Sequence, residues 1–332
     1  MTRLRVLSFG LGPIGMAAAR FALTRTSIEL VGAVDLDPQK VGKDLGDLLA
    51  LGRRTNVVVE PDAAAAIARL RPDAILHCTS SFLPVVAEQL LLAAEAGVDV
   101  VSSTEELLVP DLQHPELAAR IDAAAKAGGA TIVGTGVNPG FAMDYVATVA
   151  SAATFDVGHV RCERVVDAGT RRLPLQRKVG AGMTVDEFRV AEQSGRFGHI
   201  GMRESVALLG RAIGLQLDSI TQTLEPVLAT EERITPFLTV GKGQVAGIRN
   251  VGQGRRGAEL VVELDLSMYV GAPAPHDDIT LTGTPTIRLR FEGGIPGDQA
   301  TAAILVNTLH SAAAASPGLK TVLEIPPPRL AR

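Results

Sequence analysis

The chain has 332 residues, which is the length of about two domains and enough to bury a large core. With 46% hydrophobic and 20% charged residues, its composition is that of an ordinary globular protein. The net charge of −4 leaves no basic surplus to neutralise phosphates, and there is no Trp and only two Tyr for base stacking or a membrane belt. We therefore expect no nucleic-acid partner and no membrane association.

Residues 1–145 alternate between short apolar runs and Ala/Leu-rich segments of helical length. The runs predict strands at Leu4–Phe9, Ile28–Val34, Asn56–Val59, Ala74–Cys78, Asp99–Ser102 and Thr131–Gly134. The segments between them predict helices at Pro13–Arg25, Lys40–Leu51, Ala63–Leu70, Val85–Ala96 and Glu116–Lys126. This alternation is typical of βαβ units whose parallel strands are covered on both faces. We therefore expect an α/β chain whose N-terminal domain is a doubly wound Rossmann sheet.

The pattern changes after about residue 155. Glu259–Tyr269 and Thr286–Phe291 alternate apolar and polar residues, which is typical of half-exposed antiparallel strands. Helices are predicted at Thr184–Ser194, Met202–Ile213 and Asp298–Ala315. We expect residues 146–297 to form an α+β domain with a mostly antiparallel sheet for substrate binding and dimerisation. Residues 298–315 are expected to pack back on the first domain.

A glycine-rich loop, Gly10-Leu11-Gly12-Pro13-Ile14-Gly15, follows the first predicted strand and opens the first predicted helix. In a dinucleotide-binding loop the first glycine permits the tight turn, the second lets a pyrophosphate approach, and the third lets helix and strand pack closely. Pro13 suits the first turn of the helix, whose N–H groups and dipole attract phosphate. We expect these residues, Ile14 included, to bind NAD or NADP; the alternative is a tight turn that binds nothing.

Polar residues at the ends of the next strands complete the expected cofactor site. Asp35 follows the second strand, 20 residues after Gly15, where a carboxylate can bind the adenosine ribose. Its charge favours NAD by repelling a 2′-phosphate, whereas Lys40 can offset that repulsion, so the preference between the two cofactors stays open. Thr79 and Ser80, after the strand that ends at Cys78, are also expected to contact the cofactor.

The strand Asp99–Ser102 is followed by the acidic pair Glu105 and Glu106. Ligands of open parallel sheets bind at the carboxyl ends of the strands, so a carboxylate there can reach a substrate above the nicotinamide. Adjacent residues point in different directions, and at most one of the two faces the site. The alternative is a solvent-facing helix start, where glutamate is favoured by the helix dipole.

Two further segments carry candidate substrate ligands. The rigid loop of residues 134–140 follows a strand end and presents Asn138, which offers a donor and an acceptor beside the nicotinamide. The stretch 171–204 is dense in polar groups; Arg171 and Lys178 can bind a carboxylate, cofactor phosphate or solvent. In this stretch, His199 lies between Gly198 and Gly201. Its ring either contacts a substrate or forms its hydrogen bonds within a turn. The six histidines and two cysteines show no metal-ligand spacing, and we expect no metal site.

Three motifs together give the chain a family resemblance. The glycine loop, Ser103-Thr104-Glu105-Glu106-Leu107 and Gly136-Val137-Asn138-Pro139-Gly140-Phe141-Ala142-Met143-Asp144 resemble the dihydrodipicolinate-reductase-like amine dehydrogenases, a group that includes 2,4-diaminopentanoate dehydrogenase. Gly198-His199-Ile200-Gly201 and the segments 176–182 and 297–303 extend the resemblance over nearly the whole chain. The paired histidines and the Lys-x-Asp-Ala-Pro-Ser-Gly-Thr stretch of true dihydrodipicolinate reductases are missing, which disfavours that exact activity.

The two widely separated cysteines fit a reducing environment, and we expect a cytoplasmic protein. The resemblance implies a homodimeric NAD(P)-dependent enzyme that interconverts an amine with a ketone or aldehyde plus ammonia. It implies that Glu105 is the catalytic acid/base and that Asn138, Phe141 and His199 contact the substrate. Two other readings remain open: a reductase of a cyclic imine or carbonyl on the same scaffold, and a non-catalytic NAD(P)-binding sensor. The identity of the amine, and whether it carries a carboxylate, stay open as well.

Overall fold

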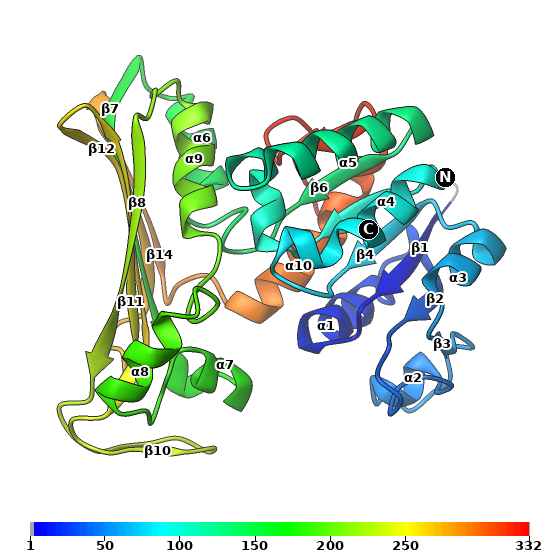
Figure 1. The fold of residues 1–332 in the computed structure, drawn as a ribbon, viewed down its shortest axis with the longest axis horizontal. Coiled ribbons are helices and arrows are strands. Elements are labelled where there is room, and N and C mark those ends of the chain that lie inside the picture. Colours follow the sequence, from blue (N-terminus) through cyan, green and yellow to red (C-terminus); the bar gives the residue numbers. More distant parts are fainter. Residues whose placement is uncertain (1–2, 332) are drawn as a thin grey trace. The chain divides into compact units, whose positions relative to one another are not determined.

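The computed structural model describes residues 3–331. The chain forms two compact units: unit 1 comprises Met1–Gly140 and Pro296–Arg332, and unit 2 comprises Phe141–Ile295. The chain therefore leaves unit 1 after Gly140 and returns to it at Pro296, so the C-terminal segment completes unit 1 (Figure 1). No helix within residues 3–331 is both long and apolar enough to cross a membrane.

Unit 1 contains a seven-stranded parallel sheet in the order β15-β6-β5-β4-β1-β2-β3. Its strands are β1 (Leu4–Phe9), β2 (Ile28–Val34), β3 (Val59–Glu60), β4 (Ala74–His77), β5 (Asp99–Ser102), β6 (Thr131–Gly134) and β15 (Gly318–Lys320). Its helices are α1 (Pro13–Ala22), α2 (Leu45–Leu48), α3 (Ala63–Leu70), α4 (Leu83–Glu95), α5 (Pro115–Gly128) and α10 (Gly297–Ala313), with short 3-10 turns η1 (Glu105–Leu108) and η2 (Pro110–Leu112). This confirms the predicted doubly wound sheet.

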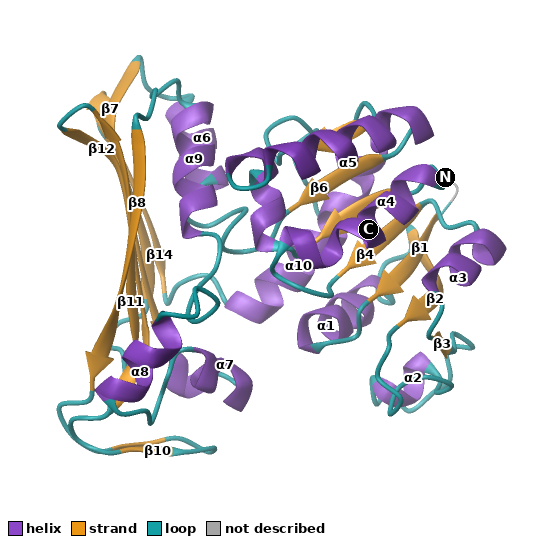
Figure 2. Ribbon diagram, viewed as in Figure 1, coloured by secondary structure: helices purple, strands orange, loops and turns teal. Residues whose placement is uncertain are grey.

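Apolar residues on both faces of the strands hold unit 1 together. Helices α4 and α5 contact each other over one face, and α1 and α10 contact each other over the opposite face (Figure 2). The strand residues Leu7, Ile75, Val100 and Ile132 are at most 1% exposed, which is why these strands read as continuous apolar runs. The sheet edge at the carboxyl ends of β1, β4 and β5 is therefore fixed by a large core.

Two predicted elements of unit 1 are much shorter than expected. The helix expected at Lys40–Leu51 is limited to the four residues of α2. The strand expected at Asn56–Val59 is limited to the two residues of β3, Val59 and Glu60. The cause is the buried Asp44, whose carboxylate accepts hydrogen bonds from the backbone N–H groups of Gly46, Thr55 and Asn56 at 2.7 to 2.9 Å. These bonds cap α2 and pin the following loop, so the segment cannot continue as either regular element.

Unit 2 contains a six-stranded, mostly antiparallel sheet in the order β14-β13-β7-β12-β11-β8, which confirms the predicted second fold class. Its strands are β7 (Asp156–Asp167), β8 (Ser219–Leu228), β11 (Val245–Arg256), β12 (Glu259–Tyr269), β13 (His276–Thr284) and β14 (Ile287–Glu292), and a separate ribbon pairs β9 (Arg233–Ile234) with β10 (Thr239–Val240). Only β7 and β12 pair in parallel. The helices are α6 (Tyr145–Ser151), α7 (Leu173–Lys178), α8 (Val185–Glu192) and α9 (Met202–Ala212), with a 3-10 turn η3 (Ala168–Thr170).

Helix α9 lies on strands β8, β11 and β12, and α6 contacts β7 and β13. The approach of α9 is close because β11 carries glycine where the helix crosses it. A Cβ added at Gly252 would come within 2.7 Å of Met202, and one added at Gly254 within 2.9 Å of Val206. These two glycines are therefore required by packing rather than by backbone conformation.

The opposite face of the unit 2 sheet is polar and covered with ion pairs. Arg161 contacts Glu263 at 3.0 Å, and Arg249 contacts Asp265 at 2.6 Å, each pair joining neighbouring strands. The apolar residues of the alternating strands, such as Leu264 at 0% exposure, face the helices instead. The apolar face of this sheet is therefore covered by the helices of unit 2 itself.

Candidate functional site

The glycine loop of unit 1 contains two glycines that the fold itself requires. Gly10 has a positive φ of +89°, and a Cβ there would lie 2.4 Å from the carbonyl oxygen of Cys78. A Cβ at Gly15 would lie 1.8 Å from the carbonyl oxygen of Gly10. Both contacts are with backbone atoms, which cannot move aside, so any side chain at either position would displace the loop from β4.

Gly12 differs from its two neighbours. An added Cβ at Gly12 meets no atom within 4 Å, and its φ of −63° is one that any residue adopts. Neither packing nor backbone strain therefore requires glycine here. The residue is the N-cap of α1, which begins at Pro13 as predicted, and the first-turn N–H groups of a helix have no intrahelical acceptors. This open cradle at a helix N-terminus fits the pyrophosphate of a dinucleotide.

Asp35 lies at the end of β2 and is tied to the glycine loop. Its carboxylate accepts the backbone N–H of Leu11 at 2.7 Å and that of Asp37 at 2.8 Å, and the Lys40 ammonium lies 3.2 Å away. Burial opposes ionisation of this carboxyl, but the two backbone hydrogen bonds and Lys40 outweigh it and hold its pKa below the ordinary value. Lys40 also contacts Asp37 at 3.3 Å, so its charge is shared between two carboxylates. Oδ2 of Asp35 already accepts from Leu11 and Lys40, so Oδ1, which accepts the N–H of Asp37, is the oxygen with capacity for a further donor such as a ribose hydroxyl.

Thr79 and Ser80 lie in the loop that follows β4. The Thr79 hydroxyl donates to Oε1 of Gln89 at 2.7 Å, and the Ser80 hydroxyl accepts the N–H of Phe82 at 3.3 Å. The structure thus places both residues beside the glycine loop, because the carbonyl oxygen of the adjacent Cys78 packs against Gly10.

Glu105 and Glu106 open η1, directly after β5, and they have different surroundings. The Glu106 side chain is buried, and its carboxylate accepts the N–H of Leu83 at 2.7 Å and lies 3.2 Å from Nε2 of His114. Glu106 therefore caps the start of α4. Glu105 is only partly buried.

Glu105 lies close enough to Cys78 for its charge to act on that thiol. Burial, together with the negative charge of Glu105, raises the pKa of the Cys78 thiol to about 12, and a hydrogen bond with Ser103 opposes the rise. Cys78 also packs against Gly10 and Gly15. The structure therefore brings the Glu105 carboxylate to the same edge of the sheet as the glycine loop.

Asn138 belongs to the loop between β6 and unit 2. The loop is held by the hydrogen bond from the N–H of Val137 to Oγ1 of Thr301 on α10, at 3.3 Å. Gly140 has a φ of +117°, and a Cβ there would lie 2.6 Å from the backbone nitrogen of Gly136. The tight turn of this loop thus explains its glycines. The Asn138 side chain, which the loop carries, is partly buried.

His199 of unit 2 lies in a loop whose glycines are also required by backbone geometry. Gly198 has a φ of +85° and Gly201, the N-cap of α9, a φ of +97°. Burial, together with the positive charges of Lys178 and Arg164, lowers the pKa of His199 to about 3. The predicted residues His199 and Lys178 therefore lie close enough for the Lys178 charge to act on His199. The His199 ring is neutral at pH 7.

Arg164 was not predicted from the sequence. Its side chain is 3% exposed and contacts Asp277, itself 2% exposed, at 2.5 Å. It also donates to the carbonyl oxygen of Ile295 at 2.6 Å, while the N–H of Ile295 donates to Asp277 at 2.7 Å. This buried pair fixes the last residue of unit 2 before the chain enters α10. No local signal marks the pair, because its members are 113 residues apart.

The remaining predicted residues of unit 2 lie around α6 and α7. Phe141 stacks on Tyr145 with a ring-centroid distance of 6.1 Å. Arg171 precedes α7, and its carbonyl oxygen accepts a hydrogen bond from Gln176 at 2.8 Å. Gln176 is fully buried and also accepts from Thr235 at 3.0 Å, so it fixes the loop that carries Arg171. Gln176 is a further residue whose structural role the sequence did not reveal.

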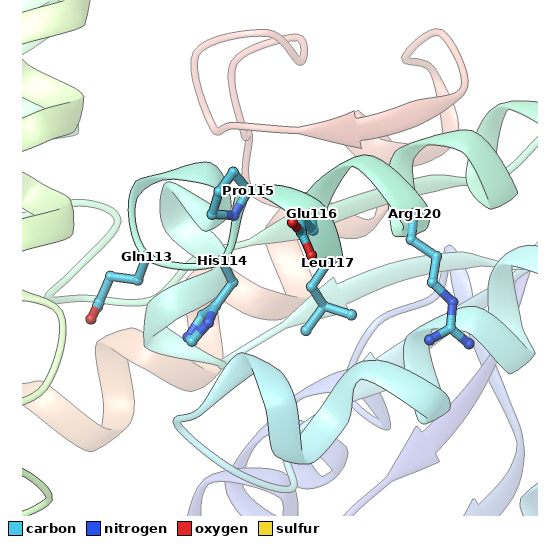
Figure 3. Close-up of a pocket in the computed structure, with 6 residues that line it drawn as sticks. All are labelled: Gln113, His114, Pro115, Glu116, Leu117 and Arg120. Atoms are coloured by element: carbon cyan, nitrogen blue, oxygen red, sulfur yellow. The ribbon is translucent and has the colours of Figure 1, made fainter.

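A surface pocket of about 570 Å³ lies at the start of α5 (Figure 3). It is lined by Gln113, His114, Pro115, Glu116, Leu117 and Arg120. None of the predicted site residues lines it. Within residues 3–331 no cluster of His, Cys, Asp and Glu has an arrangement that would hold a metal ion.

Comparisons with known proteins show the family to which the chain is similar. The family described as 2,4-diaminopentanoate dehydrogenase C-terminal domain matches residues 141–331. The chain is 31% identical over 337 residues to a 2,4-diaminopentanoate dehydrogenase of Acetoanaerobium sticklandii, covering 99% of this chain and 95% of the relative. It is 26% identical over 346 residues to an amine dehydrogenase of Streptomyces virginiae, with 96% and 95% coverage. The solved amine dehydrogenase of Mycobacterium smegmatis superposes with a TM-score of 0.87 at 30% identity, covering 98% of this chain and 97% of that one.

Proposed function

The chain belongs to the 2,4-diaminopentanoate dehydrogenase family of amine dehydrogenases, and we propose that it catalyses the reversible oxidative deamination of a small amine to a ketone or aldehyde plus ammonia, with Glu105 as acid/base. Family membership makes it an NAD(P)-dependent oxidoreductase acting on amines. The observation that carries the proposal for Glu105 is its place at the end of β5, where its charge acts on Cys78 beside the glycine loop.

The residues that would hold the cofactor fit a dinucleotide. Gly12 leaves room for the pyrophosphate, and the backbone N–H groups at the start of α1, from Ile14 onward because Pro13 has none, would point toward it. Asp35 would accept the ribose hydroxyls of NAD, and Lys40 would partly offset its charge toward the 2′-phosphate of NADP. When bound, the nicotinamide ring accepts a hydride in the oxidative direction and donates one in the reductive direction.

Glu105 would carry out the proton transfers. A free amine is almost wholly protonated at pH 7, and its carbon cannot be oxidised until the nitrogen has lost a proton. The Glu105 carboxylate takes that proton and releases it to solvent, and it then takes a proton from the water that attacks the oxidised iminium carbon. It returns this proton to the carbinolamine nitrogen, and as ammonia leaves and the carbonyl forms it takes up the hydroxyl proton, which passes on to the departing ammonia to give ammonium. As an anion it also stabilises the positive charge that develops on the iminium.

The other predicted residues would bind and orient the substrate. We propose that Asn138, Phe141 and His199 contact it, as the family resemblance implies. Since burial and two nearby cations keep the His199 ring neutral, it would act as a hydrogen-bonding group and not as a cation. Arg171 and Lys178 would favour a substrate that carries a carboxylate, such as a diamino acid.

We further propose a cytoplasmic homodimer that uses unit 2 for association. A six-stranded sheet whose polar face carries no helix of its own unit offers a flat surface for a second copy. Light scattering at micromolar concentration should give twice the monomer mass of 34.7 kDa. A monomer mass under these conditions would contradict the proposal.

The function is tested by NADH and NADPH oxidation over a panel of small ketones, aldehydes and oxo acids, with and without ammonia. An amine dehydrogenase oxidises the cofactor only when ammonia and a carbonyl are both present. Equal rates without ammonia would instead identify a reductase of a carbonyl or cyclic imine. Tight NADH binding with no turnover of any carbonyl or amine would identify a sensor.

A further inference from the structure

A buried hydrogen-bond network lies under Glu105 and joins the ends of β4 and β5. His77, the last residue of β4, is 1% exposed, and its Nδ1 lies 2.9 Å from the hydroxyl of Ser102, the last residue of β5. Its Nε2 lies 2.7 Å from Oε1 of Gln89 on α4 and 3.0 Å from the Thr79 hydroxyl. Burial lowers the pKa of His77 to about 4, so the ring is neutral at pH 7.

The network continues from Ser102 to the residue that precedes Glu105. The Ser102 hydroxyl donates to Oγ1 of Thr104 at 2.9 Å and accepts the N–H of Thr104 at 3.1 Å. The Thr104 hydroxyl donates to the carbonyl oxygen of Ser80 at 2.8 Å. Ser102 and Thr104 are both at most 1% exposed, so these bonds are shielded from water.

The residue that follows Glu105 is anchored to the same loop. The N–H of Glu106 donates to the carbonyl oxygen of Ser81 at 3.3 Å, and its carboxylate accepts the N–H of Leu83. Residues 104 and 106 are therefore both bonded to the segment 80–83, and both are buried. Glu105 is the partly exposed residue between these two anchors.

We propose that the chain His77–Ser102–Thr104 is a positioning device for Glu105, which it holds in register with the Thr79–Ser81 loop beside the cofactor-binding glycines. His77 and Thr104 are positioning residues that act through Glu105. This inference rests on the proposed function, because it assigns a purpose to Glu105. A positioned base loses efficiency when it shifts by a fraction of an ångström, so a loosened Thr104 should slow the proton transfers more than cofactor binding.

The test uses paired substitutions at Thr104. Thr104→Val keeps the shape but removes the hydroxyl, and it should lower kcat about tenfold. Thr104→Ser keeps the hydroxyl and should restore kcat to within about twofold of the wild type. The matched control is Thr308→Val on α10, because Thr308 is 0% exposed and its hydroxyl donates to the carbonyl oxygen of Ile304 at 2.7 Å. Thr308→Val should lower the melting temperature to a similar degree and leave kcat unchanged.

A double-mutant cycle with Glu105→Gln separates positioning from a general structural role. If Thr104 acts through Glu105, Thr104→Val should change kcat by less than about twofold in the Glu105→Gln background. The same tenfold loss in both backgrounds would overturn the proposal, as would a kcat for Thr104→Val equal to that of Thr308→Val. Ammonia-dependent turnover of the wild type, measured in the same assay, tests the proposed function separately.

Hydrogen exchange gives a readout of the device that does not depend on turnover. The amides of residues 103–107 should exchange faster in Thr104→Val than in the wild type or in Thr308→Val. Unchanged exchange across this segment would show that the Thr104 bonds do not hold the Glu105 turn and would overturn the proposal.

Discussion

Two regions of the chain offer a group that can exchange protons with a substrate, and their settings differ. Glu105 lies on the edge of the unit 1 sheet, partly exposed, between two anchored residues. His199 lies in the 198–201 loop of unit 2, where burial, Lys178 and Arg164 lower its pKa to about 3. Burial and two cations disfavour a positive charge on His199, whereas an anionic carboxylate stabilises the positive charge of an ammonium or iminium group beside it.

The two regions also differ in why they contain glycine. Gly198 and Gly201 have positive φ angles, so backbone geometry accounts for them without any ligand. Gly12 has an ordinary φ and open space around its Cα, so a ligand is the better explanation. A glycine motif in a sequence therefore indicates a ligand only when neither turn geometry nor packing requires the glycine.

The largest expected effect on cofactor binding comes from filling the open space at Gly12. Gly12→Ala should weaken NADH binding by at least about tenfold, because the added methyl group occupies the approach of the pyrophosphate. The melting temperature should barely change, since the methyl meets no protein atom within 4 Å. Fluorescence titration with NADH measures the affinity. The control is Gly158→Ala on β7, whose added Cβ would meet its nearest atom only at 3.9 Å and which should alter neither quantity.

The next effect concerns the preference between NAD and NADP. It tests whether the ribose binds at Asp35, on the edge of the unit 1 sheet where Glu105 also lies. Asp35→Asn removes the charge that repels a 2′-phosphate and frees Lys40 from one partner, while an amide oxygen remains to accept the N–H of Leu11. The ratio of kcat/KM for NADP to that for NAD should rise about five- to tenfold, an effect of roughly 1 kcal/mol. Asp37→Asn is the control and should shift the ratio less. An unchanged ratio in Asp35→Asn would show that Asp35 is not the ribose ligand.

The smallest effect concerns stability and tests the neutral state assigned to His199. The folded pKa of about 3 lies below the unfolded value of 6.5, so between these values the unfolded chain binds a proton that the folded chain does not. This contribution to stability is complete above pH 6.5 and is lost as the pH falls toward 3, at up to about 1.4 kcal/mol per pH unit. His199→Gln should flatten the fall of unfolding free energy with decreasing pH. Identical slopes for the variant and the wild type would contradict a buried neutral His199.

Most of the fold of unit 1 was predictable because its longer strands are largely apolar runs and most of its helices are Ala/Leu-rich segments. The strand β15, Gly318–Lys320, was not predicted, because three residues are too few to show such a pattern. A second exception is the segment 40–59, where one buried carboxylate, Asp44, pins the backbone into a short helix and loop. In unit 2 the strands β12 and β14 showed alternation, but β11 did not, because Gly252 and Gly254 stand where apolar side chains would mark its inner face. Glycine stands at these two positions because α9 packs closely against β11, and no local pattern reveals that contact.

The sequence offered Gly12, Asp35 and Glu105 as candidates because each lies in a motif with a known mechanism, and their roles stay predictions. The site could not be predicted where a residue acts through a distant partner. The buried pair of Arg164 with Asp277 depends on strand pairing across 113 residues. Likewise, His77 reads as one more scattered histidine until β4 and β5 align it with Ser102.

The most direct test of the account compares the turnover of Glu105→Gln with that of His199→Gln under ammonia-dependent conditions. Glu105→Gln keeps the shape but removes the base, so kcat should fall by about 10²–10⁴-fold while NADH affinity stays nearly constant. His199→Gln keeps a hydrogen-bonding group and should lower kcat by less than about tenfold, and Glu106→Gln, which alters a helix cap, should keep most activity. If His199→Gln or Glu106→Gln loses more activity than Glu105→Gln, the acid/base is not Glu105 and the central claim is wrong.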